Sequence, residues 1–327
     1  MSRFFGFVLA VCVLVIGGST SVPAAGPDWP KSLTISSASP GGVFYVYGEL
    51  LAQVLTQKLG ISANSMPTGG SVHNIKLVED GSMPVGIITM GVGMEGWNGS
   101  ADWTKGQKFR QMRALFPAYD SPFQYVALRR SGLSRFVDLD GKRVGVGPKA
   151  GAGALYAPEV LKALGVSAQY ISGSWDANVA DILAGNCAAL AGFAGVPLPA
   201  IQQLEAKEPV NFLDLSADEI GQVRKAIPEI TPSKIPAGIY KGLTVDQNTI
   251  GIFIFVIGRA DLSEDFIYHL VKAVYENQTD LAKRLPAFAE TVVQNVDKDT
   301  FLPFHPGAIR YYRELGIKIP DALVPTN

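Results

Sequence analysis

Apolar and polar positions near the start of the chain follow a repeating order of strand, turn and helix. Ser32 to Ser36 and Ile61 to Met66 are extended, β-prone segments, and Val85 to Thr89 is an apolar, β-branched run. From Val43 to Leu59 apolar residues recur at helical spacing, and Gly60 follows where a C-terminal cap belongs. Strand and helix alternating at this short spacing predict a parallel α/β sheet.

A similar order returns later in the chain. Ala168 to Gly195 repeats the layout of Ile61 to Gly93, which is strand, turn, helix, glycine and apolar strand. The likeness is one of pattern, and it predicts two lobes of similar architecture. We expect the chain to cross between the lobes at Gln124 to Arg130 and again at Thr249 to Gly258. Tyr119 to Pro122 is expected to interrupt the extended run that precedes the first crossing.

Glycine-rich turns lead into the first two helices. Gly41 and Gly42 precede the helix that begins at Val43, and Gly70 precedes Ser71, the expected N-cap of the next helix. A glycine at such a turn lets the backbone approach a ligand closely. A helix start adds unpaired N–H groups and the positive end of the helix dipole. The two turns therefore predict one wall of a pocket for a small, negatively charged molecule.

The first 25 residues have the layout of a secretory signal. Arg3 precedes the apolar run Phe4 to Ile16, and Val22-Pro23-Ala24 is a small-residue cleavage site. The alternative, a membrane anchor, needs roughly 18 apolar residues, more than this run contains. We expect export with cleavage and a periplasmic location. About 300 residues then remain, more than one hydrophobic core usually serves.

Charge and cysteine content exclude some classes of partner and covalent cross-link. The 28 Lys and Arg residues nearly balance the 29 Asp and Glu residues, so no basic patch for nucleic acid or an anionic membrane is indicated. Cys187 is the only cysteine after the signal and lies in an apolar run, which indicates a buried small side chain. We therefore expect no nucleic-acid partner and no disulfide.

Motifs that resemble catalytic or cofactor sites lack the context that such sites need. Gly91 to Gly96 has dinucleotide-binding spacing, but Trp97 to Ser100 predicts a turn where the phosphate-binding helix should begin. No His or Cys pair has metal-ligand spacing. The segment around Ser71 lacks the closing glycine of a nucleophile elbow. We expect no enzyme activity, no cofactor and no metal. His305 is expected to be structural, with ligand contact as the alternative.

Five segments, in this order, carry a resemblance to a known family. They are Gly41-Gly42-Val43-Phe44-Tyr45; Thr68-Gly69-Gly70-Ser71-Val72 with Asn74; Leu139 to Val144; Ile235 to Tyr240; and Phe304 to Ala308 with Tyr311-Tyr312. The chain resembles the TAXI family, the extracytoplasmic solute receptors of TRAP transporters. The resemblance implies a two-lobed α/β periplasmic-binding-protein fold, of the class with two crossing strands and a ligand cleft between the lobes. It also implies delivery of the ligand to an ion-coupled TRAP membrane permease.

The resemblance implies a ligand class as well. Family ligands are small carboxylates such as glutamate, glutamine and 2-oxoglutarate. Where the family has a Gly-Ser-Gly-Thr-like turn, this chain reads Ala150-Gly151-Ala152-Gly153-Ala154 and lacks the hydroxyls. One or two side-chain hydrogen bonds are lost, each worth about 0.5–1.5 kcal/mol. The ligand is therefore expected to be less polar at that end, or to differ from the family's amino acids.

These observations combine into one set of expectations. The expected divisions are a signal peptide at 1–25, the first part of lobe I at 26–128, lobe II at 129–248, and the return strand with the rest of lobe I at 249–327. The expected ligand contacts are Gly42, Val43, Tyr45, Thr68, Gly70, Ser71 and Asn74 in lobe I, with Gly151, Ala152, Gly153, Trp175, Asp176, Gly195, Val196 and Pro197 in lobe II. Two alternatives to a TRAP receptor stay open: a binding protein for an ABC importer or a sensor kinase, and a secreted enzyme.

Overall fold

The computed structural model describes residues 26–227, 229–298 and 301–325. The expected signal peptide at 1–25 lies outside the described residues. The strands are β1 (Ser32–Ser36), β2 (Ser62–Met66), β3 (Val85–Thr89), β4 (Met112–Leu128), β5 (Arg143–Gly145), β6 (Gln169–Ile171), β7 (Ala189–Phe193), β8 (Val210–Phe212), β9 (Thr231–Ile235) and β10 (Gln247–Arg259). The α-helices are α1 (Val43–Leu59), α2 (Ser71–Asp80), α3 (Met90–Asn98), α4 (Ala152–Ala163), α5 (Trp175–Leu183), α6 (Pro199–Lys207), α7 (Ala217–Ala226), α8 (Glu264–Glu276), α9 (Gln278–Arg284) and α10 (Pro306–Glu314).

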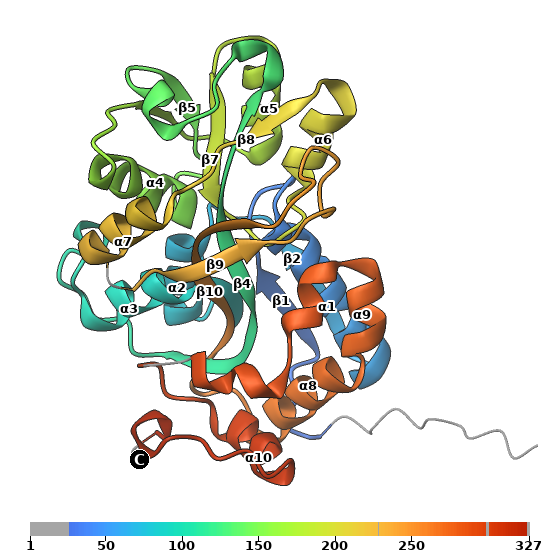
Figure 1. Ribbon diagram of the computed structural model, residues 1–327. Helices are drawn as coiled ribbons and strands as arrows, with labels where there is room; N and C mark the ends of the chain where they lie inside the picture. Colours follow the sequence, from blue (N-terminus) through green and yellow to red (C-terminus); the bar gives the residue numbers. More distant parts are fainter. Residues whose placement is uncertain (1–25, 228, 299–300, 326–327) are drawn as a thin grey trace, which may run out of the picture.

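The strands form two parallel groups joined by antiparallel strands. Their order is β2-β1-β3-β10-β4-β7-β5-β6, with β8 beside β4 and β9 beside β10. In the first group β1 runs parallel to β2 and β3, and in the second β5 runs parallel to β6 and β7. Figure 1 shows the groups as two lobes, with α4, α5 and α6 around the upper one and α1, α8 and α9 beside the lower one. The predicted two-lobed α/β fold is confirmed.

β4 is a single strand that serves both lobes. It pairs with β10 over Met112 to Pro122, and then with β7 and β8 over Phe123 to Leu128. The predicted interruption at Tyr119 to Pro122 is wrong, since each of these four residues is paired with β10. The two register shifts in this pairing lie earlier in β4, at Leu115 and Ala118. Cross-strand pairing thus overrides the local turn preference of Asp-Ser-Pro.

A second difference concerns the glycine motif after β3. Gly91 to Gly96 lies inside α3, which continues to Asn98 and ends at the left-handed Gly99, so the predicted turn begins two residues too early. The glycines make room for neighbouring side chains. A Cβ on Gly91 would lie 2.4 Å from the Tyr156 hydroxyl oxygen, and one on Gly96 would lie 2.9 Å from the Trp103 ring. Packing therefore accounts for a spacing that resembles a nucleotide motif.

The chain after β10 returns to the first lobe, as contacts of the segment between α9 and α10 show. The Tyr47 ring of α1 stacks on Phe288 at a centroid distance of 3.8 Å, and its hydroxyl lies 2.9 Å from that of Thr291. His305 is buried at the start of α10, where its Nδ1 accepts the N–H of Gly307 at 3.2 Å. His305 therefore has the structural position expected for it.

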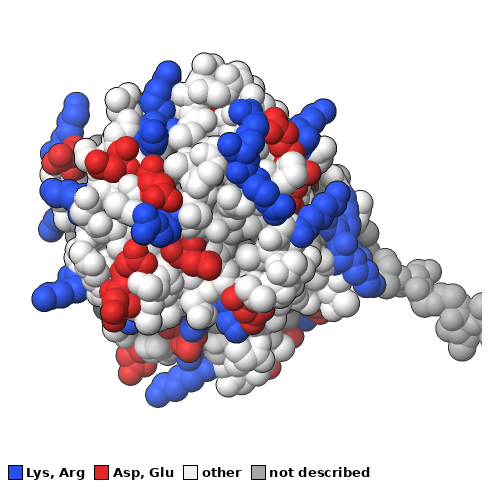
Figure 2. All heavy atoms as spheres, turned by 45° about the horizontal axis from the view of Figure 1, so that its top comes forward, with Lys and Arg blue, Asp and Glu red and all other residues white. Residues whose placement is uncertain are grey.

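The surface carries charges of both signs. On the face drawn in Figure 2, Lys and Arg side chains and Asp and Glu side chains are scattered over a mostly uncharged surface, and neither sign forms one continuous patch. Among the described residues, none of the helices is long and apolar enough to cross a bilayer.

Candidate functional site

A small cavity of about 40 Å³ lies between the two lobes, at the starts of several helices. Its first-lobe lining is Ala38, Gly42, Val43, Phe44, Gly70, Ser71 and Thr89. Its second-lobe lining is Pro148, Gly151, Ala152, Gly153, Trp175, Phe193, Ala194 and Gly195. Most of these residues lie at or directly before the beginnings of α1, α2, α4 and α5, or at or directly after the ends of β3 and β7, and Ala38 and Pro148 lie in the loops after β1 and β5. The carboxyl ends of parallel strands are where open α/β sheets usually bind ligands.

The two lobes touch across this cavity. The N–H of Val72 donates to the carbonyl of Ala150 at 3.2 Å, and the N–H of Ala200 donates to the carbonyl of Gly41 at the same distance. Gly70 has a φ of 107°, and a Cβ there would lie 2.8 Å from the Cα of Gly151. The described conformation is therefore closed, and Gly70 allows the backbones of the two lobes to meet.

Trp175 spans the junction between the lobes. A Cβ on Gly42 would lie 2.8 Å from its Cδ1, and Cβ atoms on Gly147 and Gly192 would each lie 2.7 Å from its six-membered ring. Trp175 is 6% exposed. The three glycines thus form a slot for the indole, which covers the cavity from the second lobe and reaches the start of α1.

Ser71 lines the cavity but does not cap α2. The N-cap position belongs to Gly70, and Ser71 is the first helical residue. Its Oγ accepts the backbone N–H of Thr89 at 3.0 Å and the Thr89 hydroxyl at 3.3 Å. The predicted cap is therefore wrong. The unusual backbone of Gly70 directs the chain so that Ser71 faces the end of β3.

Asn74 and Thr68 hold the turn before α2 and do not line the cavity. The Asn74 amide nitrogen donates to the carbonyls of Ser37 and Ile87, both at 2.7 Å, and its Oδ1 accepts the Thr68 hydroxyl at 2.6 Å. The Thr68 oxygen in turn accepts the N–H of Gly70 at 3.1 Å. Because Asn74 is fully buried and bonded at both ends of its amide, it ties α2 to β1 and β3.

The remaining predicted contacts lie outside the lining. Tyr45 is half-buried on α1, and Val196 and Pro197, joined by a cis peptide bond, follow Gly195. Asp176 stands beside Gly41, and its Oδ1 accepts the side-chain amide of Gln203 at 2.9 Å. Six lining residues were not predicted as contacts: Ala38, Phe44, Thr89, Pro148, Phe193 and Ala194. Thr89 and Phe193 end predicted strands, and that position alone marks them as candidates.

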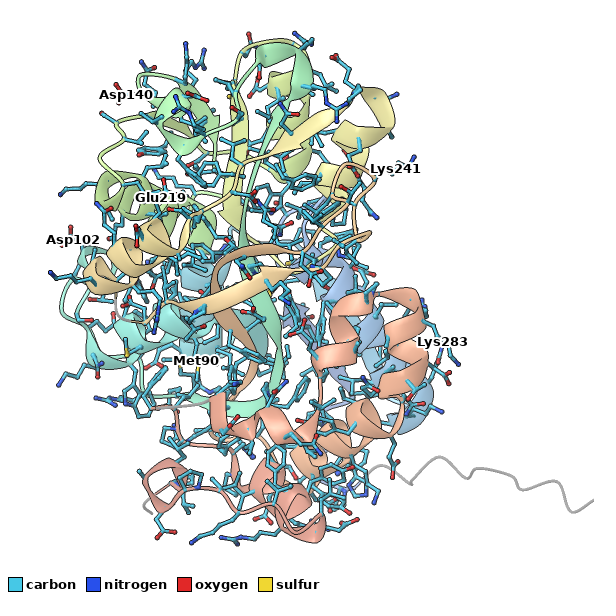
Figure 3. All side chains as sticks on the ribbon, viewed as in Figure 1. Met90, Asp102, Asp140, Glu219, Lys241 and Lys283 are labelled. Atoms are coloured by element: carbon cyan, nitrogen blue, oxygen red, sulfur yellow. The ribbon has the colours of Figure 1, made fainter. Side chains whose placement is uncertain are left out.

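A second, larger cavity of about 1030 Å³ lies along the crossing strands. Met90, labelled in Figure 3, is one of its lining residues, with the carboxylates of Asp120, Glu229 and Glu290. The Asp120 N–H donates to Glu290 at 2.9 Å, and the Ser233 hydroxyl donates to the Asp120 carboxylate. Burial, with the nearby Asp120 charge, raises the pKa of Glu290 to about 7. No residue of this cavity was predicted as a site.

Solved structures share this fold at low sequence identity. The periplasmic binding protein BugD has a TM-score of 0.58 at 14% identity, with 89% of this chain and all of that chain covered. An R. palustris protein solved with adipate has a TM-score of 0.56 at 15% identity, over 80% of this chain and 88% of that one. MatC from Rhodopseudomonas palustris, with bound malate, has a TM-score of 0.54 at 14% identity, over 87% and 96%. At these identities the likeness is one of fold.

One family model extends over most of the chain. The model of the NMT1-like family matches residues 35–316, which include both lobes and every residue that lines the cavity between them. The chain therefore belongs to the NMT1-like family.

Proposed function

We propose that this protein is an extracytoplasmic solute receptor that captures a small carboxylate-bearing solute by closing its two lobes around it. The observation that carries the proposal is the cavity between helix starts from both lobes. The fold shared with BugD and MatC supports it. BugD is described as a periplasmic binding protein, and MatC was solved with bound malate.

The chemistry of the lining supports an anionic ligand. The first residues of α1, α2 and α4 line the cavity, and the first N–H groups of a helix have no partner within it. Those N–H groups and the helix dipoles favour negative charge. No Asp or Glu is among the lining residues, so nothing there repels an anion. Malate and adipate, held by two proteins of this fold, are also carboxylates.

Closure is the proposed mechanism of capture. We assign lobe I to 26–128 and 249–327 and lobe II to 129–248, joined by β4 and β10. The ligand would contact residues of both lobes only in the closed form, so binding favours closure. The hydrogen bonds between Val72 and Ala150 and between Ala200 and Gly41 add to the closed form.

Delivery to a membrane permease completes the proposal. The five family-like segments support a TRAP-type, ion-coupled permease as the partner, and the layout of residues 1–25 supports export to the periplasm. Co-purification of the protein with TRAP permease subunits from its own organism tests the partner. If an ABC importer co-purifies instead, the protein is still a solute receptor, but its partner is that importer and the proposed TRAP permease is wrong.

The function itself is tested by a thermal-shift screen of the refolded protein against carboxylates, amino acids and sugars. A solute at 100 times its dissociation constant should add about 2.7 kcal/mol to the free energy of unfolding. Ala152→Val should weaken that solute's binding at least about tenfold, because added methyl groups overpack a close-fitted lining. Ala226→Val, at the exposed end of α7, is the matched control and should bind normally.

Two outcomes would contradict the proposal. Stabilisation by sugars alone would exclude the carboxylate class. Unchanged binding in Ala152→Val would place the ligand outside the cavity between the lobes.

A further inference from the structure

Two buried side chains offer hydrogen-bond donors at the cavity between the lobes. The Trp175 side chain is 6% exposed, and its indole N–H, which can only donate, makes no hydrogen bond among the described residues. This atom lies at the start of α1, about where a side chain on Gly42 would sit, since a Cβ there would be 3.0 Å away. Because no described residue accepts this N–H, an acceptor atom of a ligand in the cavity can bond it.

Ser71 is the second donor. It is 1% exposed, and its oxygen already accepts both the N–H and the hydroxyl of Thr89. Its own proton has no acceptor among the described residues and is available to a ligand in the cavity. Together with the helix starts, these groups call for a ligand rich in acceptor atoms.

The same lining offers no carboxylate to pair with an ammonium group. It contains no Asp, Glu, Asn, Gln or His side chain. The carboxylate of Asp176 stands beside Gly41, outside the lining, and is bonded to Gln203. An ammonium group has three donors and no acceptor, and burying it without a carboxylate is costly. An amino acid therefore fits this cavity poorly, whereas the 2-oxo acid of the same skeleton brings only acceptors.

The side chains of the lining restrict the rest of the ligand. Phe44, Trp175 and Phe193 supply aromatic walls. The lining also has no Lys or Arg for a second carboxylate. The ligand is accordingly one with a single negative charge and an otherwise apolar skeleton.

We infer that the site selects 2-oxo monocarboxylates, with the 2-oxo oxygen accepting the Trp175 N–H, and rejects the corresponding amino acids. The inference rests on the proposed receptor function and names its substrate class.

Isothermal titration of the refolded protein tests the inference with matched ligands. Pyruvate is compared with L-alanine for the amino group, with propionate for the oxo group, and with 2-oxoglutarate for length and charge. We expect pyruvate to bind at least about tenfold more tightly than each of the other three. In Trp175→Phe, the advantage of pyruvate over propionate should fall by about three- to tenfold, the usual worth of one hydrogen bond. Trp97→Phe, on the half-buried ring beside Arg110, is the control and should keep the advantage.

Each other outcome overturns the inference. Equal or tighter binding of L-alanine would show that the site accepts an ammonium group, and tighter binding of 2-oxoglutarate would show a longer, doubly charged ligand. An unchanged preference for pyruvate over propionate in Trp175→Phe would remove the indole from recognition. In all three cases the receptor function stands.

If none of the four acids binds but another carboxylate stabilises the protein, the substrate class alone fails. If no carboxylate stabilises it, the proposed function fails too.

Discussion

Gly70 is a residue at which the backbones of the two lobes meet. Its φ of 107° is unfavourable for any other residue, and a Cβ would lie 2.8 Å from Gly151 Cα. We expect Gly70→Ala to lower the free energy of unfolding by at least about 1–2 kcal/mol and also to weaken ligand binding, because the methyl group holds the lobes apart. Urea unfolding and ligand titration measure the two effects.

Gly132 provides the control for this variant. It also has a positive φ, 72°, but a Cβ there would have nothing within 4 Å. Gly132→Ala should therefore lose stability while it keeps normal affinity. Equal affinity in the two variants would show that close contact between Gly70 and Gly151 is not needed for capture.

At the level of elements, the start of α10 depends on a buried histidine. Burial lowers the pKa of His305 to about 4, and its Nδ1 caps the helix by accepting the Gly307 N–H. The unfolded chain takes up this proton near pH 6.5, before the folded protein does. The contribution of neutral His305 to the free energy of unfolding is therefore fully present above about pH 6.5. It falls by about 3 kcal/mol in all as the pH is lowered toward 4.

Urea unfolding between pH 4 and pH 7 measures this loss. His305→Asn keeps a side-chain acceptor for the cap but has no proton to gain. The stability of the wild type relative to this variant should decline as the pH is lowered. Parallel curves for the two proteins would mean that His305 titrates normally in the folded state.

At the level of the whole molecule, Trp175 should report the movement of the lobes. It lies against Gly41 and Gly42 of the first lobe. The other tryptophans contact residues assigned to their own lobe: Trp29 packs on Phe266, Trp97 lies under Arg110, and Trp103 packs on Phe109. Opening would expose the indole to water and shift its emission to the red. We expect ligand to shift the emission of the wild type to the blue, as fluorescence titration would record. Trp175→Phe should lack this change, and a full change in that variant would place the motion elsewhere.

Local features of the chain were predictable where local physics decides them. The periodic apolar positions of α1 and the cap at Gly60 follow from side-chain spacing and from the left-handed backbone that glycine permits. The glycine turns before α1 and α2 do line the cavity, as Gly42 and Gly70 show. Predicted contacts at Tyr45 and Asn74 differ, because their positions depend on how each helix rotates against its sheet.

The division between sequence and tertiary structure follows the range of the forces involved. The sequence by itself determined the alternation of strands and helices, the repeat of that order in two lobes, and glycines at the helix starts, because backbone preference and side-chain periodicity act between neighbours. Only the tertiary structure decided that β4 runs unbroken into both lobes, that Ser71 bonds Thr89, and that Trp175 reaches Gly42. These features depend on packing and pairing between residues distant in the chain, which no local pattern encodes.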